Sequence, residues 1–254
     1  MIEVKNLSAG YFGKIIVKNV TMQFMPGEVL VLLGPNGSGK TTLLKAALGL
    51  IPSTNGEILY DGIEIRQLKR KEIAQKAAFL SQSRNTPSIQ AFRMVLHGRF
   101  PYLSYPRQYS ERDKQIAHEA MEMTGSSKYE KMNVSELSGG QRQGVYLAMA
   151  LAQDTETVFM DEPTTYLDIS HQLNVMQTAQ QLAADGKAVV LVLHDLSLAL
   201  SGADKVAVFS EGQLCSCDTP KKIYQSGVLN EVFGVAVHCM DTPHGTQYYC
   251  INSR

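Results

Sequence analysis

One stretch decides the fold of this 254-residue chain: Gly34-Pro35-Asn36-Gly37-Ser38-Gly39-Lys40-Thr41. It follows the apolar run Val29 to Leu33 and precedes Thr42 to Leu48, so a strand, a glycine-rich loop and a helix come in succession. This context is typical of a P-loop, in which glycines let backbone N–H groups converge on phosphate oxygens without a Cβ in the way. An ordinary glycine-rich turn would not bring the lysine, the hydroxyl and both flanking elements together.

The chemistry expected at this loop is the binding of a nucleoside triphosphate. The helix expected to open at Gly39 or Lys40 adds the positive end of its dipole. Lys40 can reach the β- and γ-phosphates, and the Thr41 hydroxyl can ligate magnesium. The predicted phosphate-binding residues are Gly34, Pro35, Asn36, Gly37, Ser38, Gly39, Lys40, Thr41 and Thr42.

Length, charge and cysteine usage narrow the class of protein. The chain is long enough for one large domain, or for a core with a subdomain. Lys plus Arg and Asp plus Glu both number 24, so the net charge is zero, which argues against a nucleic-acid binder with a basic surface. We expect a soluble, cytoplasmic chain, because no apolar run reaches the ~18–20 residues of a membrane span and no signal-peptide pattern is present. Four cysteines without zinc spacing are expected to be reduced: Cys215, Cys217, Cys239 and Cys250.

Two kinds of strand are expected. Alternating apolar and polar residues predict a half-buried antiparallel sheet from Ile2 to Leu7, Ile15 to Phe24 and Glu57 to Ile65. Ser8-Ala9-Gly10 is expected to end the first of these strands, and Asp61-Gly62 predicts a hairpin turn in the last. Continuous apolar runs predict parallel strands buried on both faces at Val29 to Leu33, Val158 to Met160, Ala188 to Leu193 and Val206 to Phe209. With helices such as Leu173 to Ala184 between them, the core is predicted to be a layered α/β sheet.

The chain changes character between Gln82 and Ser138. Ala91 to Arg99 and Ser110 to Thr124 are predicted helices, and no buried-strand run appears there. We therefore predict one domain over residues 1–254, with a helical subdomain at 83–152 inserted into a core of 1–82 and 153–220. Residues 221–254 are expected to be a tail, with a short helix from Lys221 to Gln225 and little pattern after it.

Two carboxylates follow the predicted strand Val158 to Met160. Asp161 and Glu162 come at its carboxyl end, where α/β sheets place their ligands. Successive side chains of a strand cannot aim at one point, so different roles are expected. Asp161 would hold magnesium through its water shell, and Glu162 would polarise an attacking water. The alternative is an exposed acidic strand end.

A second phosphate-binding helix start is predicted at Leu137-Ser138-Gly139-Gly140-Gln141. Ser138 can cap a helix that runs to Ala152, and the glycines leave its first N–H groups bare. One chain then carries two phosphate-binding ends in different subdomains. A dimer uses both, if each nucleotide lies between the P-loop of one copy and this helix start of the other.

These motifs resemble those of the nucleotide-binding subunit of an ABC transporter. The resemblance runs from Met1 to about Gly234, and it includes the Walker A loop Gly34 to Thr41, the signature Leu137 to Gln141 and the Walker B strand ending in Asp161-Glu162. It implies a P-loop NTPase (RecA-like) core with an N-terminal antiparallel β subdomain and an inserted α-helical subdomain. It also implies ATP and Mg²⁺ as cofactors, and ATP hydrolysis as the activity.

The resemblance assigns roles to further residues. Gln82 would contact magnesium or the attacking water, and His194 would contact the γ-phosphate. Tyr11 fits the aromatic residue that stacks on adenine, although Phe12 is its neighbour, and Asp168 fits the loop that meets the other subunit. The nucleotide of the other copy would be contacted by Ser138, Gly139, Gly140 and Gln141. The remaining histidines match no metal-ligand spacing and are interpreted as structural: His97, His118, His171, His238 and His244.

One branch of the family is similar in several stretches, the ATPases of iron–siderophore, haem and cobalamin importers. These stretches are Val95 to Tyr102, Glu162 to Gln172, Leu193 to Ala199 and Val232 to Val235. The implied partners are a second copy of the chain, an integral membrane permease and, indirectly, an extracellular substrate-binding protein, with no nucleic acid. The implied location is the cytoplasmic face of the membrane, where a groove near Gln82 to Ile89 would pass motion to the permease.

The cargo favoured by this branch is an iron complex, with haem or cobalamin as alternatives. From another class, a mechanical ABC ATPase acting on nucleic acid or ribosomes shares these motifs. Such proteins usually carry a long coiled-coil insert or two tandem cassettes, and neither is present in this sequence. A P-loop kinase would need an acceptor site and has no use for Ser138-Gly139-Gly140.

Overall fold

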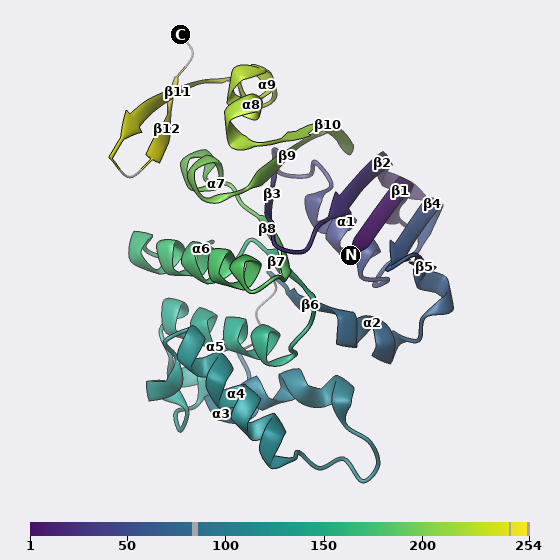
Figure 1. The fold of residues 1–254 in the computed structure, drawn as a ribbon, viewed down its shortest axis with the longest axis vertical. Coiled ribbons are helices and arrows are strands. Elements are labelled where there is room, and N and C mark those ends of the chain that lie inside the picture. Colours follow the sequence, from purple (N-terminus) through teal and green to yellow (C-terminus); the bar gives the residue numbers. More distant parts are fainter. Residues whose placement is uncertain (83–85, 244, 253–254) are drawn as a thin grey trace.

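The structure is a computed structural model that describes residues 1–82, 86–243 and 245–252 (Figure 1). Its central sheet has six strands in the order β10-β9-β3-β8-β7-β6. Strands β6, β7, β8, β3 and β9 are parallel, and β10 pairs antiparallel with β9. Their bounds are β3 Val29–Leu33, β6 Ala77–Leu80, β7 Thr157–Asp161, β8 Ala188–Val192, β9 Lys205–Ser210 and β10 Gln213–Asp218.

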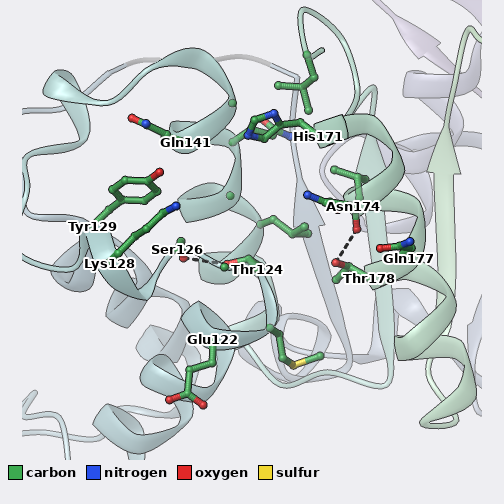
Figure 2. A pocket seen from close by; sticks show the side chains of 18 of the residues that line it. Glu122, Thr124, Ser126, Lys128, Tyr129, Gln141, His171, Asn174, Gln177 and Thr178 are labelled. Atoms are coloured by element: carbon green, nitrogen blue, oxygen red, sulfur yellow. Dashed lines mark hydrogen bonds between the residues drawn. The ribbon is translucent and has the colours of Figure 1, made fainter. Parts of the chain in front are cut away.

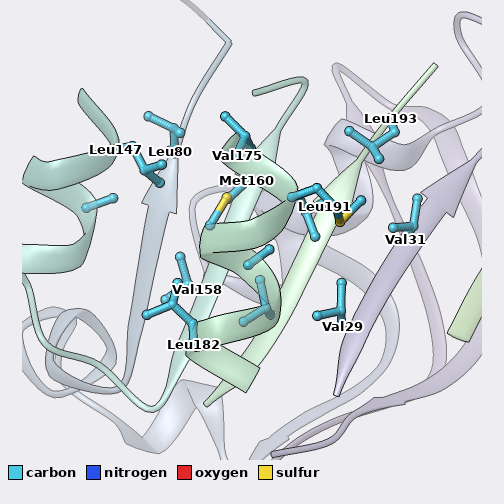
Figure 3. Close-up of a cluster of buried hydrophobic side chains, with 14 of the residues drawn as sticks. Val29, Val31, Leu80, Leu147, Val158, Met160, Val175, Leu182, Leu191 and Leu193 are labelled. Atoms are coloured by element: carbon cyan, nitrogen blue, oxygen red, sulfur yellow. The ribbon is translucent and has the colours of Figure 1, made fainter. Parts of the chain in front are cut away.

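Burial on both faces explains why the sequence of these strands is apolar throughout. Val29, Val31 and Leu33 pack into a cluster with the helices of one face, whereas Leu30 and Leu32 pack into a second cluster on the other face. Figure 3 shows part of the first cluster, where side chains of β3, β6, β7 and β8 meet those of two helices. The predicted α/β sheet of parallel, fully buried strands is therefore confirmed.

An antiparallel sheet of four strands lies beside this core, in the order β2-β1-β4-β5. Its strands are β1 Ile2–Tyr11, β2 Lys14–Phe24, β4 Ser53–Tyr60 and β5 Ile63–Glu64. The helix α1 (Lys40–Ala47) packs between the two sheets, with Leu43 and Leu44 in the same cluster as Phe24 and Phe159. The turn between β4 and β5 is made by Asp61 and Gly62, both with positive φ, as predicted.

The predicted break at Ser8-Ala9-Gly10 is wrong, because β1 continues through these residues to Tyr11. The pairing of β1 with β2 shifts register between Val4 and Leu7 and again near Ala9, and Asn6 adopts a φ of 49°. Such bulges absorb an extra residue and let the strand go on past a stretch that breaks the alternation.

A group of helices lies between β6 and β7, and among the described residues of that segment no strand occurs. Its elements are α3 Ala91–Leu96, η2 His97–Tyr102, α4 Glu111–Met123, η3 Ser127–Tyr129, η4 Val134–Glu136 and α5 Gly139–Ala152. The helix predicted to reach Arg99 ends at Leu96 and continues as the 3₁₀ segment η2. Pro101 explains the change, since it has no N–H for an α-helical bond and clashes with the carbonyl four residues back. The proposed boundary at residue 83, and part of the Gln82 to Ile89 groove, fall in 83–85, outside the described residues.

The remaining elements include a folded C-terminal unit. They are η1 Ile65–Gln67, α2 Arg70–Lys76, α6 Ile169–Ala184, α7 Leu196–Gly202, α8 Pro220–Gln225, α9 Val228–Phe233, β11 Val235–Thr242 and β12 Gly245–Asn252. Strands β11 and β12 form a hairpin, in which Val237 and Tyr248 are buried and the Tyr248 ring meets that of Tyr224 edge-on. The expectation of a weakly patterned tail after Gln225 is therefore wrong. No helix in the part of the chain that the structure describes is long and apolar enough to cross a membrane.

A buried ion pair ties the helices together. The Arg99 side chain, 6% exposed, donates from Nε to Asp113 Oδ1 (2.9 Å) and from Nη1 to the Ala152 carbonyl (3.0 Å). Asp113, 8% exposed, also accepts bonds from the N–H and hydroxyl of Ser110, which caps α4. One guanidinium thus joins η2, α4 and the end of α5.

We expect Arg99→Ala to lower the free energy of unfolding by about 3–5 kcal/mol, because it leaves the Asp113 carboxylate buried without its partner. Urea unfolding followed by circular dichroism measures this change. The control is Lys114→Ala, which removes the exposed pair Lys114–Glu111 and should change stability by at most about 1 kcal/mol. Equal effects of the two substitutions would contradict a role for the buried pair.

Candidate nucleotide-binding site

The glycine-rich loop lies at the carboxyl edge of the central sheet, between β3 and α1. Gly34 allows the loop to start there, because a Cβ at this position would lie 2.3 Å from the Phe209 carbonyl oxygen of β9. A cavity of about 120 Å³ over the loop is lined by Ile16, Asn36, Gly37, Gly39, Lys40, Thr41, Thr42 and Glu162. Predicted loop residues and one predicted acid therefore line the same cavity, together with Ile16, which the sequence did not single out.

The Lys40 side chain forms hydrogen bonds within its own loop. Its side chain is 5% exposed, and Nζ donates to the carbonyl oxygens of Gly34 (2.7 Å) and Pro35 (2.9 Å) and lies 3.2 Å from the Ser38 hydroxyl. Burial lowers the pKa of Lys40, and the nearby carboxylates of Glu162 and Asp161 oppose that shift. A phosphate that binds Lys40 would take over at least one of these three bonds.

Asp161 and Thr41 form an oxygen pair beneath the loop. The Thr41 hydroxyl donates to Asp161 Oδ1 over 2.9 Å, and Asp161 is 2% exposed. Burial raises the pKa of Asp161, while the hydrogen bond from Thr41 works against the shift. A hydroxyl and a carboxylate oxygen at this separation are the kind of ligands that hard divalent cations bind.

Three strand ends converge on Glu162. Its carboxylate accepts a bond from the Gln82 side-chain amide (2.5 Å) and lies 2.8 Å from His194 Nε2. The Thr165 hydroxyl donates to the same carboxylate over 3.2 Å. Gln82 follows β6, Glu162 follows β7 and His194 follows β8, so parallel pairing of these strands places their ends together. Gln82 and His194 thus both contact Glu162, the third residue predicted to be catalytic, and Thr165 contacts it without having been predicted.

The second predicted phosphate-binding start opens α5, as expected. Ser138 is its N-cap, with the Gln141 N–H donating to the Ser138 hydroxyl and the Ser138 N–H donating to the Gln141 side-chain oxygen. Gly140 and Gln141 line a cavity of about 650 Å³ between the end of α4, α5 and α6 (Figure 2). This cavity shares no lining residue with the one over the P-loop, so one chain does not bring the two phosphate-binding ends into one cavity.

Tyr11 and Asp168 also lie outside the P-loop cavity. Tyr11, 36% exposed, ends β1 beside the fully exposed Phe12. Asp168 caps α6, where Oδ1 accepts bonds from the His171 N–H (2.9 Å) and the Ser170 hydroxyl (2.8 Å). These bonds, the one from the His171 N–H foremost, hold the pKa of Asp168 well below its usual range.

The sequence predicts no metal-binding role for the remaining histidines or for the four cysteines. In residues 1–82, 86–243 and 245–252 no group of three or more His, Cys, Asp or Glu side chains is placed to hold a metal ion. His244 lies outside the described residues. The four cysteines are exposed free thiols.

A parallel sheet with a P-loop at its carboxyl edge defines a P-loop NTPase. The family model described as "ABC transporter" matches residues 17–165. A petrobactin import ATP-binding protein of Bacillus anthracis is 36% identical over 91% of this chain and 86% of its own length. An iron(3+)-hydroxamate import ATP-binding protein of Bacillus subtilis is 33% identical over 98% of this chain and 94% of its own.

Among solved structures, a bacterial ABC transporter cassette determined as a dimer is 30% identical, with a TM-score of 0.76 over 87% of this chain and 99% of that one. This chain belongs to the ABC transporter family, and it is a nucleotide-binding ATPase of that family. The resemblance inferred from the motifs, including the similarity to siderophore-import ATPases, is confirmed.

We expect Lys40→Ala to weaken ATP binding roughly 10- to 150-fold, because a hydrogen bond to a charged group contributes about 1.5–3 kcal/mol. Titration with a fluorescent ATP analogue measures the dissociation constant. Lys5→Ala removes an exposed lysine that pairs with Glu3 and does not line the loop cavity, so it should leave the constant unchanged. Wild-type affinity in Lys40→Ala would show that this lysine does not bind the nucleotide.

Proposed function

We propose that the chain is the ATP-binding and hydrolysing subunit of an ABC importer that powers uptake of an iron complex of the siderophore type. The observation that carries this proposal is the convergence of Gln82, Glu162 and His194 beside the P-loop, with a second phosphate-binding start in a separate cavity. The names of the two relatives, importers of petrobactin and of iron(3+)-hydroxamate, support the class of cargo.

Mg²⁺ fits the residues beneath the loop. Thr41 and Asp161 present oxygens 2.9 Å apart, close to the roughly 3 Å between neighbouring ligands of an octahedral ion with bonds of about 2.1 Å. Thr41, Asp161 directly or through water, and Gln82 would hold the ion. When bound, it would neutralise charge that develops on the β- and γ-phosphates.

The protein residues divide the chemistry between them. Lys40 and the loop N–H groups bind and orient the phosphates. Glu162 acts as general base and takes the proton of the attacking water. Gln82 and His194 hold that carboxylate in place, and His194 also reaches the γ-phosphate. Since the Glu162 carboxylate already has three neighbours, it is fixed before a water is bound.

A second copy of the chain completes each site in this proposal. Gly140 and Gln141 of the turn Ser138–Gln141 line a different cavity from the P-loop, so we infer that a nucleotide in contact with both lies between two copies. Tyr11 would stack on the adenine, and Asp168 would lie at the contact with the other copy. The dimeric cassette that this chain resembles supports such an arrangement. Removal of the γ-phosphate breaks the shared contacts and lets the copies part.

The remaining partners follow from the importer class. An integral membrane permease would hold the dimer at the cytoplasmic face of the membrane, and an extracellular substrate-binding protein would deliver the cargo. The helical subdomain, proposed to span residues 83–152 of the single domain, would pass motion to the permease. Haem or cobalamin is the second candidate cargo.

We expect Glu162→Gln to bind ATP normally but to lower the rate of hydrolysis about 10²- to 10⁴-fold, because the amide cannot take a proton. A phosphate-release assay measures the rate, and size-exclusion chromatography with ATP should show a trapped dimer. Glu57→Gln changes an exposed glutamate of β4 and should leave both readouts unchanged. Normal hydrolysis by Glu162→Gln would show that another group is the base.

We expect the tagged wild-type chain to co-purify from detergent-solubilised membranes with a permease of many membrane spans. A deletion strain should grow slowly when a ferric siderophore is the only source of iron. The wild-type gene should restore growth, and the Lys40→Ala gene should not. Co-purification with ribosomes or nucleic acid instead would contradict the importer and support a mechanical ATPase.

A further inference from the structure

His171 connects two elements of the proposed ATP clamp. It lies in the first turn of α6, and its ring Nδ1 is 2.8 Å from Asp168 Oδ1. The same oxygen accepts the backbone N–H of His171 over 2.9 Å. The carboxylate that caps α6 therefore also fixes the imidazole ring in one orientation.

One face of the ring is turned toward the start of α5. A Cβ on Gly140 would lie 3.0 Å from both Cδ2 and Nε2 of His171 and 3.2 Å from Cε1. A Cβ on the neighbouring Gly139 would meet no atom within 4 Å. Gly140 thus has a packing role that Gly139 lacks, since its missing side chain makes room for the histidine ring.

The contact between the His171 ring and Gly140 matters because a cavity lies around it. A cavity of about 650 Å³ lies between α5 and α6. Its walls include His171 and Asn174 of α6 and Gly140 and Gly144 of α5. Figure 2 shows His171 at the end of the cavity near Gln141, with Asn174 and Thr178 farther along α6. At the phosphate-binding turn itself, the ring is the side chain of α6 that reaches Gly140.

We propose that His171 is a positioning residue for the phosphate-binding turn Ser138–Gln141. The proposal rests on the proposed function, in which this turn meets the nucleotide held by the P-loop of the other copy. Asp168 fixes the ring, and the ring face sets how closely the start of α5 approaches α6. Without the ring, the cavity gives the turn room to shift, and a shift of about 1 Å in a positioning element is enough to weaken such a contact severely.

The proposal separates two kinds of nucleotide binding. Loss of the ring should weaken the contact made by the turn across the dimer. It should leave binding to the P-loop of the same chain unchanged, because no residue lines both cavities. General damage to the fold would affect both.

The test uses the full-length chain with Glu162→Gln, and it measures the ATP concentration at which half of the protein is dimeric in light scattering. We expect His171→Ala to raise this concentration about tenfold. The dissociation constant of a fluorescent ATP analogue for the monomer at low protein concentration should stay within about twofold of the parent value, and the urea midpoint should not change. Asn174→Ala is the matched control, one turn along the same cavity wall, and should not shift dimer formation.

Two further variants separate the ring contact from the helix cap. His171→Asn can still donate a side-chain N–H to Asp168 but presents no ring to Gly140, so we expect it to behave like His171→Ala. In a double-mutant cycle, His171→Ala should add little to Gly140→Ala, because the Cβ and the ring compete for one space. It should add its full effect to Gly139→Ala, where a Cβ meets nothing.

The outcomes are distinguishable. An unshifted dimer for His171→Ala, recovery by His171→Asn, or additive effects with Gly140→Ala would each overturn the positioning role while leaving the proposed function intact. Failure of the Glu162→Gln parent to form any ATP-dependent dimer would overturn the proposed function, and the positioning role with it.

Discussion

The candidate site depends on one constraint, the register of neighbouring parallel strands. Leu80 of β6 pairs with Met160 of β7, Asp161 pairs with Val192 of β8, and Val192 pairs with Leu32 of β3. The strands therefore end at one edge of the sheet, and whatever residue follows each strand is delivered there. A shift of one residue in any of these pairs would turn a site residue to the other face of the sheet. The apolar contacts that fix the register, on both faces of β3, β7 and β8, thus also determine the chemistry.

Asp161 and Glu162 show how neighbouring residues serve two different partners. Asp161 is the last residue of β7, and it points to the Thr41 hydroxyl under the loop. Glu162 leaves the strand with a φ of 50°, a left-handed conformation that is uncommon outside glycine. Its carboxylate meets Gln82 and His194 instead. Strand β7 thus ends where the Glu162 side chain must point away from that of Asp161. The free-energy cost of the unusual backbone at Glu162 is offset by the contacts of its carboxylate.

The sequence predicted the parts of the molecule whose cause is local. Strands buried on both faces have continuous apolar runs, and the Ser138 cap has a partner three residues along the chain. Glu162 was predicted by its place after such a run, and Gln82 and His194 were predicted from the family resemblance. Contacts between distant residues left no such pattern. The extension of β1 depends on bulges such as that near Asn6, and the C-terminal hairpin depends on the burial of Val237 and Tyr248. His171 is interpreted as structural from the sequence because it matches no metal-ligand spacing, and nothing in its neighbourhood in the sequence reveals that its ring faces Gly140.

The hydrogen bonds around Lys40 and Glu162 explain why nucleotide binding and dimer formation belong together in the proposed mechanism. Lys40 would be costly to bury without partners, and the loop carbonyls supply them. A phosphate that binds Lys40 exchanges these bonds for new ones, so the net gain is only the difference between two hydrogen-bonded arrangements. His194 faces the same exchange if it moves from Glu162 to a γ-phosphate. One copy alone therefore gains less from the triphosphate than its number of donors indicates. The start of α5 has N–H groups that take no part in either exchange, and in the proposed dimer they would contact the phosphate without breaking a bond of the P-loop. In the proposed mechanism the second copy would thus contribute free energy that the first site cannot supply, and this contribution would favour a closed dimer when ATP is bound.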